Sequence, residues 1–338
     1  MKQVIRKIFG ELGYYQIRDF WTIIKSHFLL LNNFFLDAVL YYKHSNVFKK
    51  NTLNKLEALV ILKYHSLEKG LLHNTVRYKF GRETVIALLL LLQKKQIIKI
   101  RDRSQISSAY LVVCKYYELH VENNVDISDY FSDNLYSQFK SYVDVKGESV
   151  LEHNSNDYFE NNDKDFYNFS KSRHSVRDYC GELIDIAIIN RVIDLAKYAP
   201  SVCNRQPVKV YYIDDKVKVD NILEVQGGLK GYDKNIYQLL VVVADRNYFY
   251  TVGERNQLYI DGGIFLMNLL YALHFYNIAA CPAHWGMNSG KDKKIAKQLS
   301  LDKSEKVISL VSIGLPSQNF KTCKSNRRST DELLRIVK

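Results

Sequence analysis

The spacing of apolar residues changes along this chain of 338 residues, and this change constrains the fold more than any other feature. In residues 1–125 apolar side chains recur every three or four positions, as on one face of a helix. Leu53, Leu56, Leu59, Val60 and Leu67 follow this rhythm after Asn51-Thr52, which can cap a helix. Further helices are expected over 82–95 and 104–122. The chain has only 4 prolines and 15 glycines, which favours long helices. We therefore predict an all-helical N-terminal region over residues 1–125.

The next segment has a different composition. Residues 126–167 are rich in Asn, Asp, Ser and Tyr, with a local excess of acidic side chains. Such a composition is typical of loops between structured segments. We predict a polar linker over 126–167 and a second domain over 168–338.

After residue 168, short apolar runs alternate with helical patterns. Runs of strand length cover 208–214, 239–244, 278–283 and 307–313, whereas 184–198 and 259–275 have the character of helices. Several connections are too short for the crossovers of a parallel sheet. An α+β fold is expected, with a central, mostly antiparallel sheet flanked by helices.

The net charge and the spacing of the cysteines restrict the kinds of ligand, partner and cellular compartment that we expect. The net charge is +12, but the basic residues are scattered and form no known nucleic-acid-binding motif, so no nucleic-acid partner is expected. A basic surface could still attract an anionic cofactor or membrane. The five cysteines include no CxxC pair, which predicts neither a metal site nor a disulfide framework and favours a reducing cytoplasm. The apolar stretch 20–42 is interrupted by Lys25 and Asp37, so we predict a soluble helix, with association at a membrane surface as the alternative.

Two arginines and a serine alternate in the segment 172–179. In an extended chain Arg173, Ser175 and Arg177 point to one side. Two guanidinium groups and a hydroxyl on one side can receive a phosphate and a polar ring edge. The alternative is that Ser175 simply caps the following helix.

A second polar segment, residues 199–207, leads from the predicted helix 184–198 into a strand. Pro200 and Pro207 restrict the loop at its two ends. The amide of Asn204 can donate and accept hydrogen bonds, which suits the polar edge of a flavin or nucleobase. The alternative is a helix-to-strand connection with Asn204 at a turn.

Together the two segments resemble the FMN-dependent nitroreductase family, whose pattern is R-x-S-x-R/K, a helix, and then A-P-S-x-x-N-x-Q-P. Here Arg173 to Arg177 and Ala199 to Pro207 match in the same order. Asp261-Gly262-Gly263 before an apolar helix, residues 281–286 and the basic run 324–328 resemble later parts of that pattern. The resemblance spans roughly half the chain, residues 168–338, and implies a nitroreductase-like fold there, FMN as cofactor and a homodimer with the flavin at the subunit interface.

The resemblance also implies roles for single residues. The implied FMN-binding residues are Arg173, His174, Ser175, Arg177, Pro200, Ser201, Asn204, Gln206, Ala283, Trp285 and either Arg327 or Arg328. Backbone near Gly286 would face flavin N5, and His284 is the candidate proton donor. Core packing is the alternative for both Trp285 and His284. Cys203 and Cys281 flank the implied site, and a redox role for either would need a lowered thiol pKa.

The resemblance implies an FMN-dependent oxidoreductase that transfers hydride through flavin N5, with NAD(P)H as donor and an unidentified small molecule as acceptor. Two alternatives remain: a flavoprotein oxidase or dehydrogenase of the same fold that does not use NAD(P)H, and a non-catalytic FMN-binding or scaffold module.

The N-terminal region contains one polar string, residues 63–71. On a helix His65, Glu68 and Lys69 share a face. We favour an ion-paired surface that ends in a C-cap at Gly70, and the alternative is a cluster that borders the flavin pocket. The string, followed by Arg77 and Phe80-Gly81, resembles one that precedes the nitroreductase domain in proteins linked to bacterial surface-polysaccharide synthesis.

Overall fold

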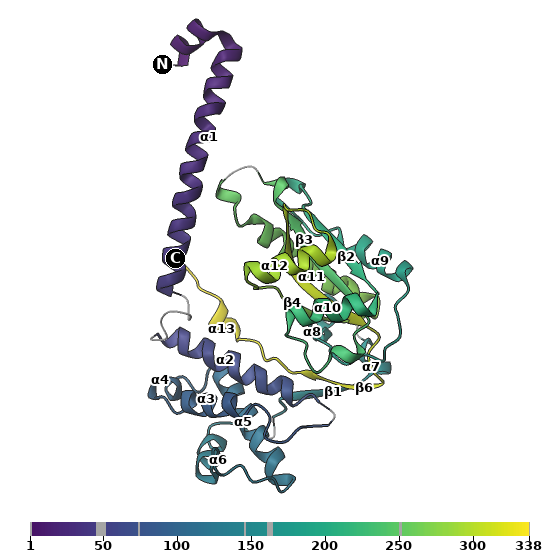
Figure 1. Ribbon diagram of the computed structural model, residues 1–338. Coiled ribbons are helices and arrows are strands. Elements are labelled where there is room, and N and C mark those ends of the chain that lie inside the picture. Colours follow the sequence, from purple (N-terminus) through teal and green to yellow (C-terminus); the bar gives the residue numbers. More distant parts are fainter. Residues whose placement is uncertain are drawn as a thin grey trace.

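The computed structural model describes residues 2–44, 52–73, 75–144, 147–160, 165–249 and 252–337. Its N-terminal region is helical, as predicted (Figure 1). The helices are α1 (Lys2–His44), α2 (Leu53–Gly70), α3 (Arg82–Leu92), α4 (Lys95–Ile98), α5 (Ser104–Glu122) and α6 (Asp133–Lys140). Thr52 precedes α2 in an extended conformation, but its side chain accepts no capping hydrogen bond.

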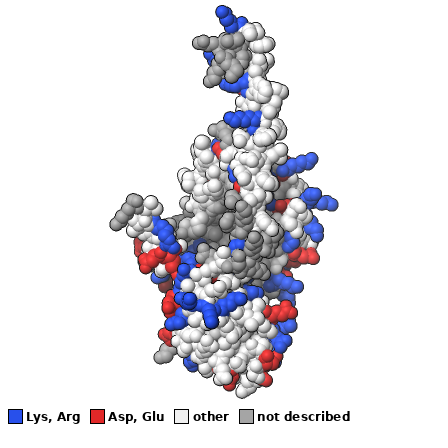
Figure 2. Space-filling view, turned by 90° about the vertical axis from the view of Figure 1, so that its left-hand side faces the viewer, with Lys and Arg blue, Asp and Glu red and all other residues white. Residues whose placement is uncertain are grey.

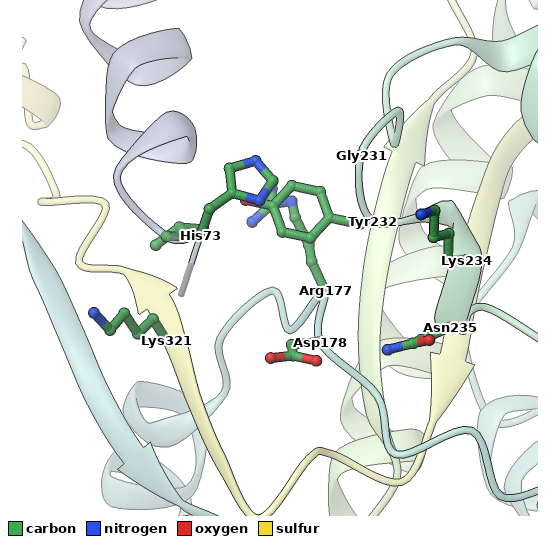
Figure 3. A pocket seen from close by; sticks show the side chains of 9 residues that line it. His73, Arg177, Asp178, Gly231, Tyr232, Lys234, Asn235 and Lys321 are labelled. Atoms are coloured by element: carbon green, nitrogen blue, oxygen red, sulfur yellow. The ribbon is translucent and has the colours of Figure 1, made fainter. Parts of the chain in front are cut away.

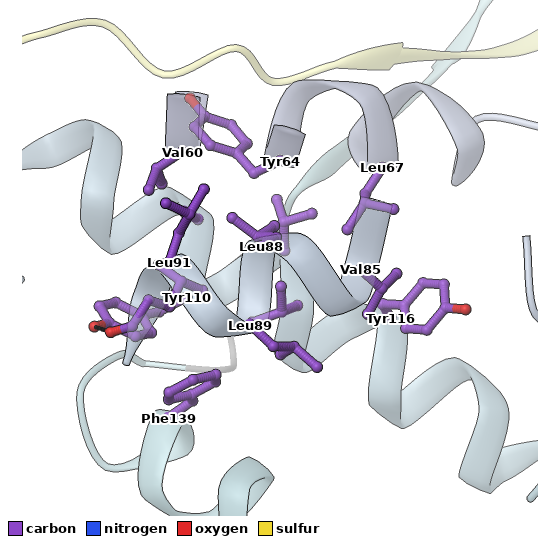
Figure 4. Close-up of a cluster of buried hydrophobic side chains, with 14 of the residues drawn as sticks. Val60, Tyr64, Leu67, Val85, Leu88, Leu89, Leu91, Tyr110, Tyr116 and Phe139 are labelled. Carbon is purple, nitrogen blue, oxygen red and sulfur yellow. Dashed lines mark hydrogen bonds between the residues drawn. The ribbon is translucent and has the colours of Figure 1, made fainter. Parts of the chain in front are cut away.

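Helices α2, α3, α5 and α6 enclose a core of their own. Val60 and Leu67 of α2, Leu88 of α3 and Tyr110 of α5 are at most 1% exposed and pack together (Figure 4). The Tyr110 hydroxyl donates to the carbonyl of Leu92 at 2.8 Å, so this large polar side chain is buried with its hydrogen bond satisfied. The apolar rhythm in the sequence therefore corresponds to a helical bundle.

The prediction of a polar linker over 126–167 is wrong for much of its length. Phe131 and Phe139, which is in α6, are fully buried in the helical core. Strand β1 (Val150–Asn154) and α7 (Ser155–Tyr158) follow, and Tyr158 packs in the core of the second half. A polar average composition concealed these few aromatic residues, and burial of each one fixes the segment around it.

The second half is built on a four-stranded sheet in the order β2-β3-β5-β4, with every neighbouring pair antiparallel. The strands are β2 (Val208–Ile213), β3 (Gln238–Asp245), β4 (Ala279–His284) and β5 (Glu305–Gly314). The helices are α8 (Phe166–Ser172), α9 (Ile186–Ala196), α10 (Lys216–Gln226), α11 (Gln257–Phe275) and α12 (Ser289–Leu299). The predicted antiparallel α+β class is confirmed.

The central strand β3 is buried on both faces and divides two cores. Leu239 and Val241 pack in the cluster that includes α10 and α12, and Leu240 and Val242 pack in the cluster that includes α9 and α11. This alternation follows from the two-residue period of a strand. Among the described helices, α11 is long and apolar enough to cross a membrane, but core helices such as this one, which packs on the sheet, have the same composition.

The C-terminal tail returns to the N-terminal helices (yellow in Figure 1). Strand β6 (Asn319–Cys323) pairs with β1, and α13 (Thr330–Leu333) lies near the end of the chain. Between them, the Gln105 side chain of α5 donates to the carbonyl of Asn326 at 2.7 Å. The Ser104 hydroxyl donates to Glu332 at 2.8 Å. The tail therefore links the helical region to the sheet.

The glycine that ends α2 has a packing role that the sequence did not reveal. Gly70 is the last helical residue, and the next residue, Leu71, is right-handed, so the predicted C-cap at Gly70 is wrong. A Cβ atom at Gly70 would lie 2.1 Å from Cε2 of Phe80. Gly70 therefore allows the Phe80 ring to lie against α2.

We expect Gly70→Ala to destabilise the protein by about 1–3 kcal/mol, because the Phe80 ring must move out of its packed position. Urea unfolding followed by circular dichroism measures the change. Gly263→Ala is the matched control, since this helical glycine of α11 has nothing within 4 Å of an added Cβ. Its substitution should be neutral or stabilising by up to ~1 kcal/mol. Equal effects of the two substitutions would contradict the packing argument.

Candidate functional site

The segment that carries Arg173, Ser175 and Arg177 is extended, as predicted. It runs between α8 and α9, and the Val176 amide donates to the Ala280 carbonyl of β4 at 3.0 Å. Val176 itself is fully buried. The next helix, α9, is capped by Asp185, whose Oδ1 accepts from the Ala187 amide at 2.7 Å. The alternative that Ser175 caps this helix is therefore wrong.

Arg173 is the most unusual side chain in the segment. Its Nε and NH1 atoms are buried, and neither has a hydrogen-bond partner in the part of the chain that the structure describes. Burial lowers the pKa of Arg173, and the positive charge of Arg327 lowers it further. A buried and unpaired cation is costly unless an anion binds it. Arg173 and Arg327 together therefore form a candidate anion site.

The groups around Arg173 are neutral rather than acidic. Burial, the charge of Arg173 and His174 lower the pKa of His274 to about 3, and burial with His174 lowers that of His153 to about 4. His174 also has a lowered pKa, through burial first, and its Nδ1 lies 2.7 Å from the Ser172 carbonyl. Nδ1 of His174 is therefore the protonated nitrogen. No ion pair of Arg173 occurs among the described residues, and a neutral imidazole supplies no negative charge to balance it.

Arg177 borders a cleft between the N-terminal helices and the sheet domain (Figure 3). The cleft has a volume of about 200 Å³. It is lined by Leu72, His73, Arg177, Asp178, Gly231, Tyr232, Lys234, Asn235 and Lys321. The excess of cationic side chains suits an anionic or electron-rich ligand.

The N-terminal region closes one side of this cleft. The His73 and Tyr232 rings stack with centroids 4.6 Å apart, and the Tyr232 hydroxyl donates to the Lys69 carbonyl at 2.8 Å. Sequence reasoning missed His73, Tyr232, Lys234 and Lys321. These residues come from separate segments, and the only local signal was the glycine-rich turn 227–231.

The polar string of α2 is not a solvated surface. Glu68 is only 3% exposed, accepts from the Ser325 amide at 3.3 Å and lies 2.8 Å from Nδ1 of His65. Burial, together with the charge of Glu68, raises the pKa of the Cys323 thiol to about 12. Ligand atoms of His65, Glu68 and Cys323 lie within 4.8 Å of one another. The bond from the Ser325 amide to Glu68 joins the C-terminal tail to α2.

The second predicted segment lies around a different cavity. Cys203, Asn204 and Gln206 all have left-handed backbone conformations, with φ of 49°, 53° and 49°. The Val202 amide donates to the buried carboxylate of Asp261 at 3.3 Å. Such strained, exposed loops often occur at binding sites.

Pro200, Ser201 and Gln206 line a cavity of about 130 Å³ with Asp261 and Phe265 of α11. This cavity shares no lining residue with the cleft at Arg177. Arg177 and the loop 200–206 therefore line two different cavities of one chain.

The strand β4 and the loop after it carry the predicted catalytic residues. His284 and Gly286 are exposed, and a Cβ at Gly286 would lie 2.9 Å from Nε2 of His284. Ala283 is buried in the sheet. Trp285 is 6% exposed, and its Nε1 donates to Asp292 at 2.7 Å. Its ring is therefore packed in the core with its N–H satisfied, in agreement with the alternative of core packing, and its backbone is the part left to contact a cofactor.

Arg327 and Arg328, adjacent in the C-terminal tail, have different surroundings. NH1 of Arg328 lies 2.8 Å from the carboxylate of Glu57, which is 3% exposed. Arg327 lies close enough to Arg173 and His174 to lower the pKa of each. Arg328 is therefore committed to an ion pair within the protein, whereas Arg327 adds its charge to the candidate anion site.

The two cysteines beside the predicted site differ in their exposure to solvent. Cys281 is 1% exposed, and burial raises its pKa. Cys203 is exposed in the strained loop. A reactive cysteine requires a lowered pKa together with access to solvent, and Cys281 has neither.

Comparison with known proteins gives a partial match. Residues 170–230 match the model of the nitroreductase family. No curated protein matches the chain. Among solved structures, a nitroreductase-like protein from Streptococcus mutans is 20% identical, with 51% of this chain and 98% of that chain covered and a TM-score of 0.44. An FMN-dependent nitroreductase from Clostridium difficile R20291 is also 20% identical, with 49% and 92% covered and a TM-score of 0.40.

Proposed function

We propose that this chain is an FMN-dependent oxidoreductase of the nitroreductase type. The observation that carries the proposal is the guanidinium of Arg173, in the segment that the family model matches: its buried Nε and NH1 have no hydrogen-bond partner among the described residues, and the charge of Arg327 acts on it. A phosphate monoester supplies the missing charge and acceptors. The test is the absorbance spectrum of the purified protein, with mass spectrometry of any released cofactor. A colourless protein that binds no added FMN would overturn the proposal.

Different residues would bind different parts of FMN. Arg173, Ser175 and Arg327 would hold the phosphate, and Arg177 would face the polar edge of the ring. Backbone from Ala283 to Gly286 would lie at the reactive edge. The flavin, when bound, supplies hydride transfer at N5. The role of Arg177 is to place positive charge where the reduced ring carries negative charge.

We further propose that NAD(P)H is the electron donor and that the acceptor is a small molecule, in line with a role in surface-polysaccharide synthesis. Steady-state oxidation of NADH and NADPH by the FMN-loaded protein tests this step. Oxidation of an organic substrate with reduction of oxygen, and with neither nicotinamide consumed, would favour an oxidase or dehydrogenase of the same fold. Bound FMN without any turnover would favour a non-catalytic binding module. The cytoplasm, where reduced nicotinamides are available, is the proposed location.

The separation of the two polar segments suggests how the site is completed. A single chain presents Arg177 in one cleft and the loop 200–206 around another cavity. We propose a homodimer in which Asn204, with Pro200, Ser201 and Gln206, comes from the second subunit. Each flavin site would then need Arg173 from one chain and Asn204 from the other.

A mixed dimer tests this arrangement. Arg173→Met and Asn204→Ala should each weaken FMN binding at both sites of their own homodimers. A heterodimer of the two variants should recover one intact site, so purified heterodimer should bind about half the FMN of the unsubstituted protein with normal affinity. If both residues belonged to a site within one chain, no intact site would form and no recovery would occur. Differential tags on the two chains isolate the heterodimer.

A further inference from the structure

The long helix α1 exposes more apolar surface than any other described element. It extends away from the rest of the protein, and its side chains are largely uncharged along much of its length (Figures 1 and 2). Its contacts with the body lie on one side. Leu30 and Phe34 border a groove formed with Phe249 and Leu258, and Asp37 accepts from Nε of Arg255 at 2.9 Å. These contacts hold the C-terminal half of α1 and leave another face uncovered.

The uncovered face carries a regular repeat. Its residues follow one another at alternating intervals of three and four, and they are Trp21, Ile24, Phe28, Leu31, Phe35, Ala38 and Tyr42. We call these seven residues the α1 stripe. The six large side chains are between 43% (Ile24) and 78% (Phe28) exposed, and Ala38 is exposed as well. A repeat of 3.5 residues per turn keeps one seam facing a partner helix in a left-handed coiled coil.

The stripe does not have the composition of a helix that lies on a membrane. Such helices carry Lys and Arg along their polar face. Between residues 20 and 42, Lys25 is the only lysine or arginine. Outside the stripe this part of α1 carries Ser26, Asn33 and Asp37, together with the exposed apolar residues Ile23, Leu29 and Leu36. The periodicity and the absence of a basic face both favour a helix as the partner.

We propose that α1 forms a parallel two-stranded coiled coil with α1 of a second copy of this chain, through the α1 stripe. A stripe of this kind is self-complementary, as a twofold interface requires. At the observed exposures its side chains present on the order of 700 Å² per chain, on the basis of ~150–250 Å² for a fully exposed aromatic residue. This is close to the ~800 Å² per partner of a stable interface.

The parallel direction follows from where the body is attached. Arg255 and Leu258 hold the C-terminal half of α1, so parallel helices bring the two bodies to the same end. Leu258 begins a stretch of α11 whose Tyr259, Ile260 and Ile264 are also exposed. A second copy that covers the stripe would therefore also lie next to this apolar surface. An antiparallel pair would place the bodies at opposite ends and leave the surface uncovered.

Cysteine crosslinking in the full chain tests the pairing, in a background with Cys180→Ser and Cys203→Ser to remove the exposed thiols. A disulfide needs Cα atoms within about 7 Å, so Phe28→Cys on the stripe should convert most of the protein to a covalent dimer under mild oxidation. The matched control is Asn33→Cys, on the opposite face of the helix, which should remain at least tenfold less crosslinked. Equal crosslinking of the two variants, or none, would overturn the proposal.

Two further experiments distinguish the orientation of the two helices and a lipid surface as the partner. A parallel pair should also crosslink Trp21→Cys to a second Trp21→Cys chain, whereas crosslinking of Trp21→Cys only to Phe35→Cys chains would show an antiparallel pair and overturn the proposal as stated. Sedimentation with vesicles of phosphatidylcholine and phosphatidylglycerol, without crosslinking, would assign the stripe to a lipid surface. FMN content is measured in the same preparations, so loss of flavin without loss of crosslinking counts against the proposed function alone.

Discussion

Replacing Arg173 with Met should weaken FMN binding by about 10- to 150-fold without destabilising the apoprotein. Loss of a hydrogen bond to a charged group costs about 1.5–3 kcal/mol, which corresponds to that change in dissociation constant. In the apoprotein the guanidinium is buried with two unpaired N–H groups. Its replacement by an apolar side chain of similar length should therefore leave the free energy of unfolding unchanged or raise it. A residue whose replacement weakens ligand binding but does not lower the stability of the apoprotein is retained for its ligand.

Fluorescence titration of the apoprotein measures the affinity, and riboflavin is the matched ligand because it lacks only the phosphate. Arg173→Met should leave the affinity for riboflavin unchanged. An equal loss for riboflavin would move Arg173 from the phosphate to the ring. Arg328→Ala supplies a second control, since Arg328 pairs with Glu57. It should lower stability and leave FMN binding intact.

Acidification should destabilise the apoprotein steeply between pH 6.5 and pH 4. The pKa of His274 is lowered in the folded protein from 6.5 to about 3, by burial and then by Arg173 and His174. In this window the unfolded chain binds a proton that the folded chain does not. The stabilising contribution is therefore present above pH 6.5 and is lost as the pH falls toward 3. For His274 alone the loss from pH 6.5 to pH 4 is about 3 kcal/mol, and His153 acts in the same direction.

Urea unfolding at a series of pH values measures this slope. His274→Gln should flatten it, because glutamine does not titrate. His27→Gln is the matched control, since His27 is exposed on α1 and should leave the slope unchanged. A slope that is the same in all three proteins would show that His274 is not a source of the acid sensitivity. Bound FMN should also reduce the slope, because an added phosphate favours the protonated imidazoles.

Much of the fold was accessible from local patterns. The apolar run 239–244 became the fully buried central strand β3, and the rhythm from Leu53 to Leu67 became α2. The pairing of β1 with β6 was not accessible, because it joins segments about half the chain apart and neither strand has a strong apolar alternation. The helices α10 and α12 were missed because their outer faces are rich in charged residues.

The candidate site, like the fold, was predictable from local patterns only in part. The alternation of Arg173, Ser175 and Arg177 predicted an extended receptor for a phosphate, and the segment is extended. Local patterns could not distinguish Arg327 from Arg328, since adjacent residues in an irregular segment can face opposite surroundings. The choice depends on Glu57, a residue of α2 that is distant in the sequence.

The sequence by itself therefore determined the helical first half, the antiparallel sheet of the second half and the residue types of a phosphate receptor. These features depend on periodicity and side-chain chemistry, which are local. Only the tertiary structure decided that Nε and NH1 of Arg173 are buried with no hydrogen-bond partner among the described residues, that the Trp285 ring belongs to the core and that His73 lines the cleft at Arg177. Burial and pairing depend on which distant segments meet, and the net gain or cost of each contact is set by its whole surroundings.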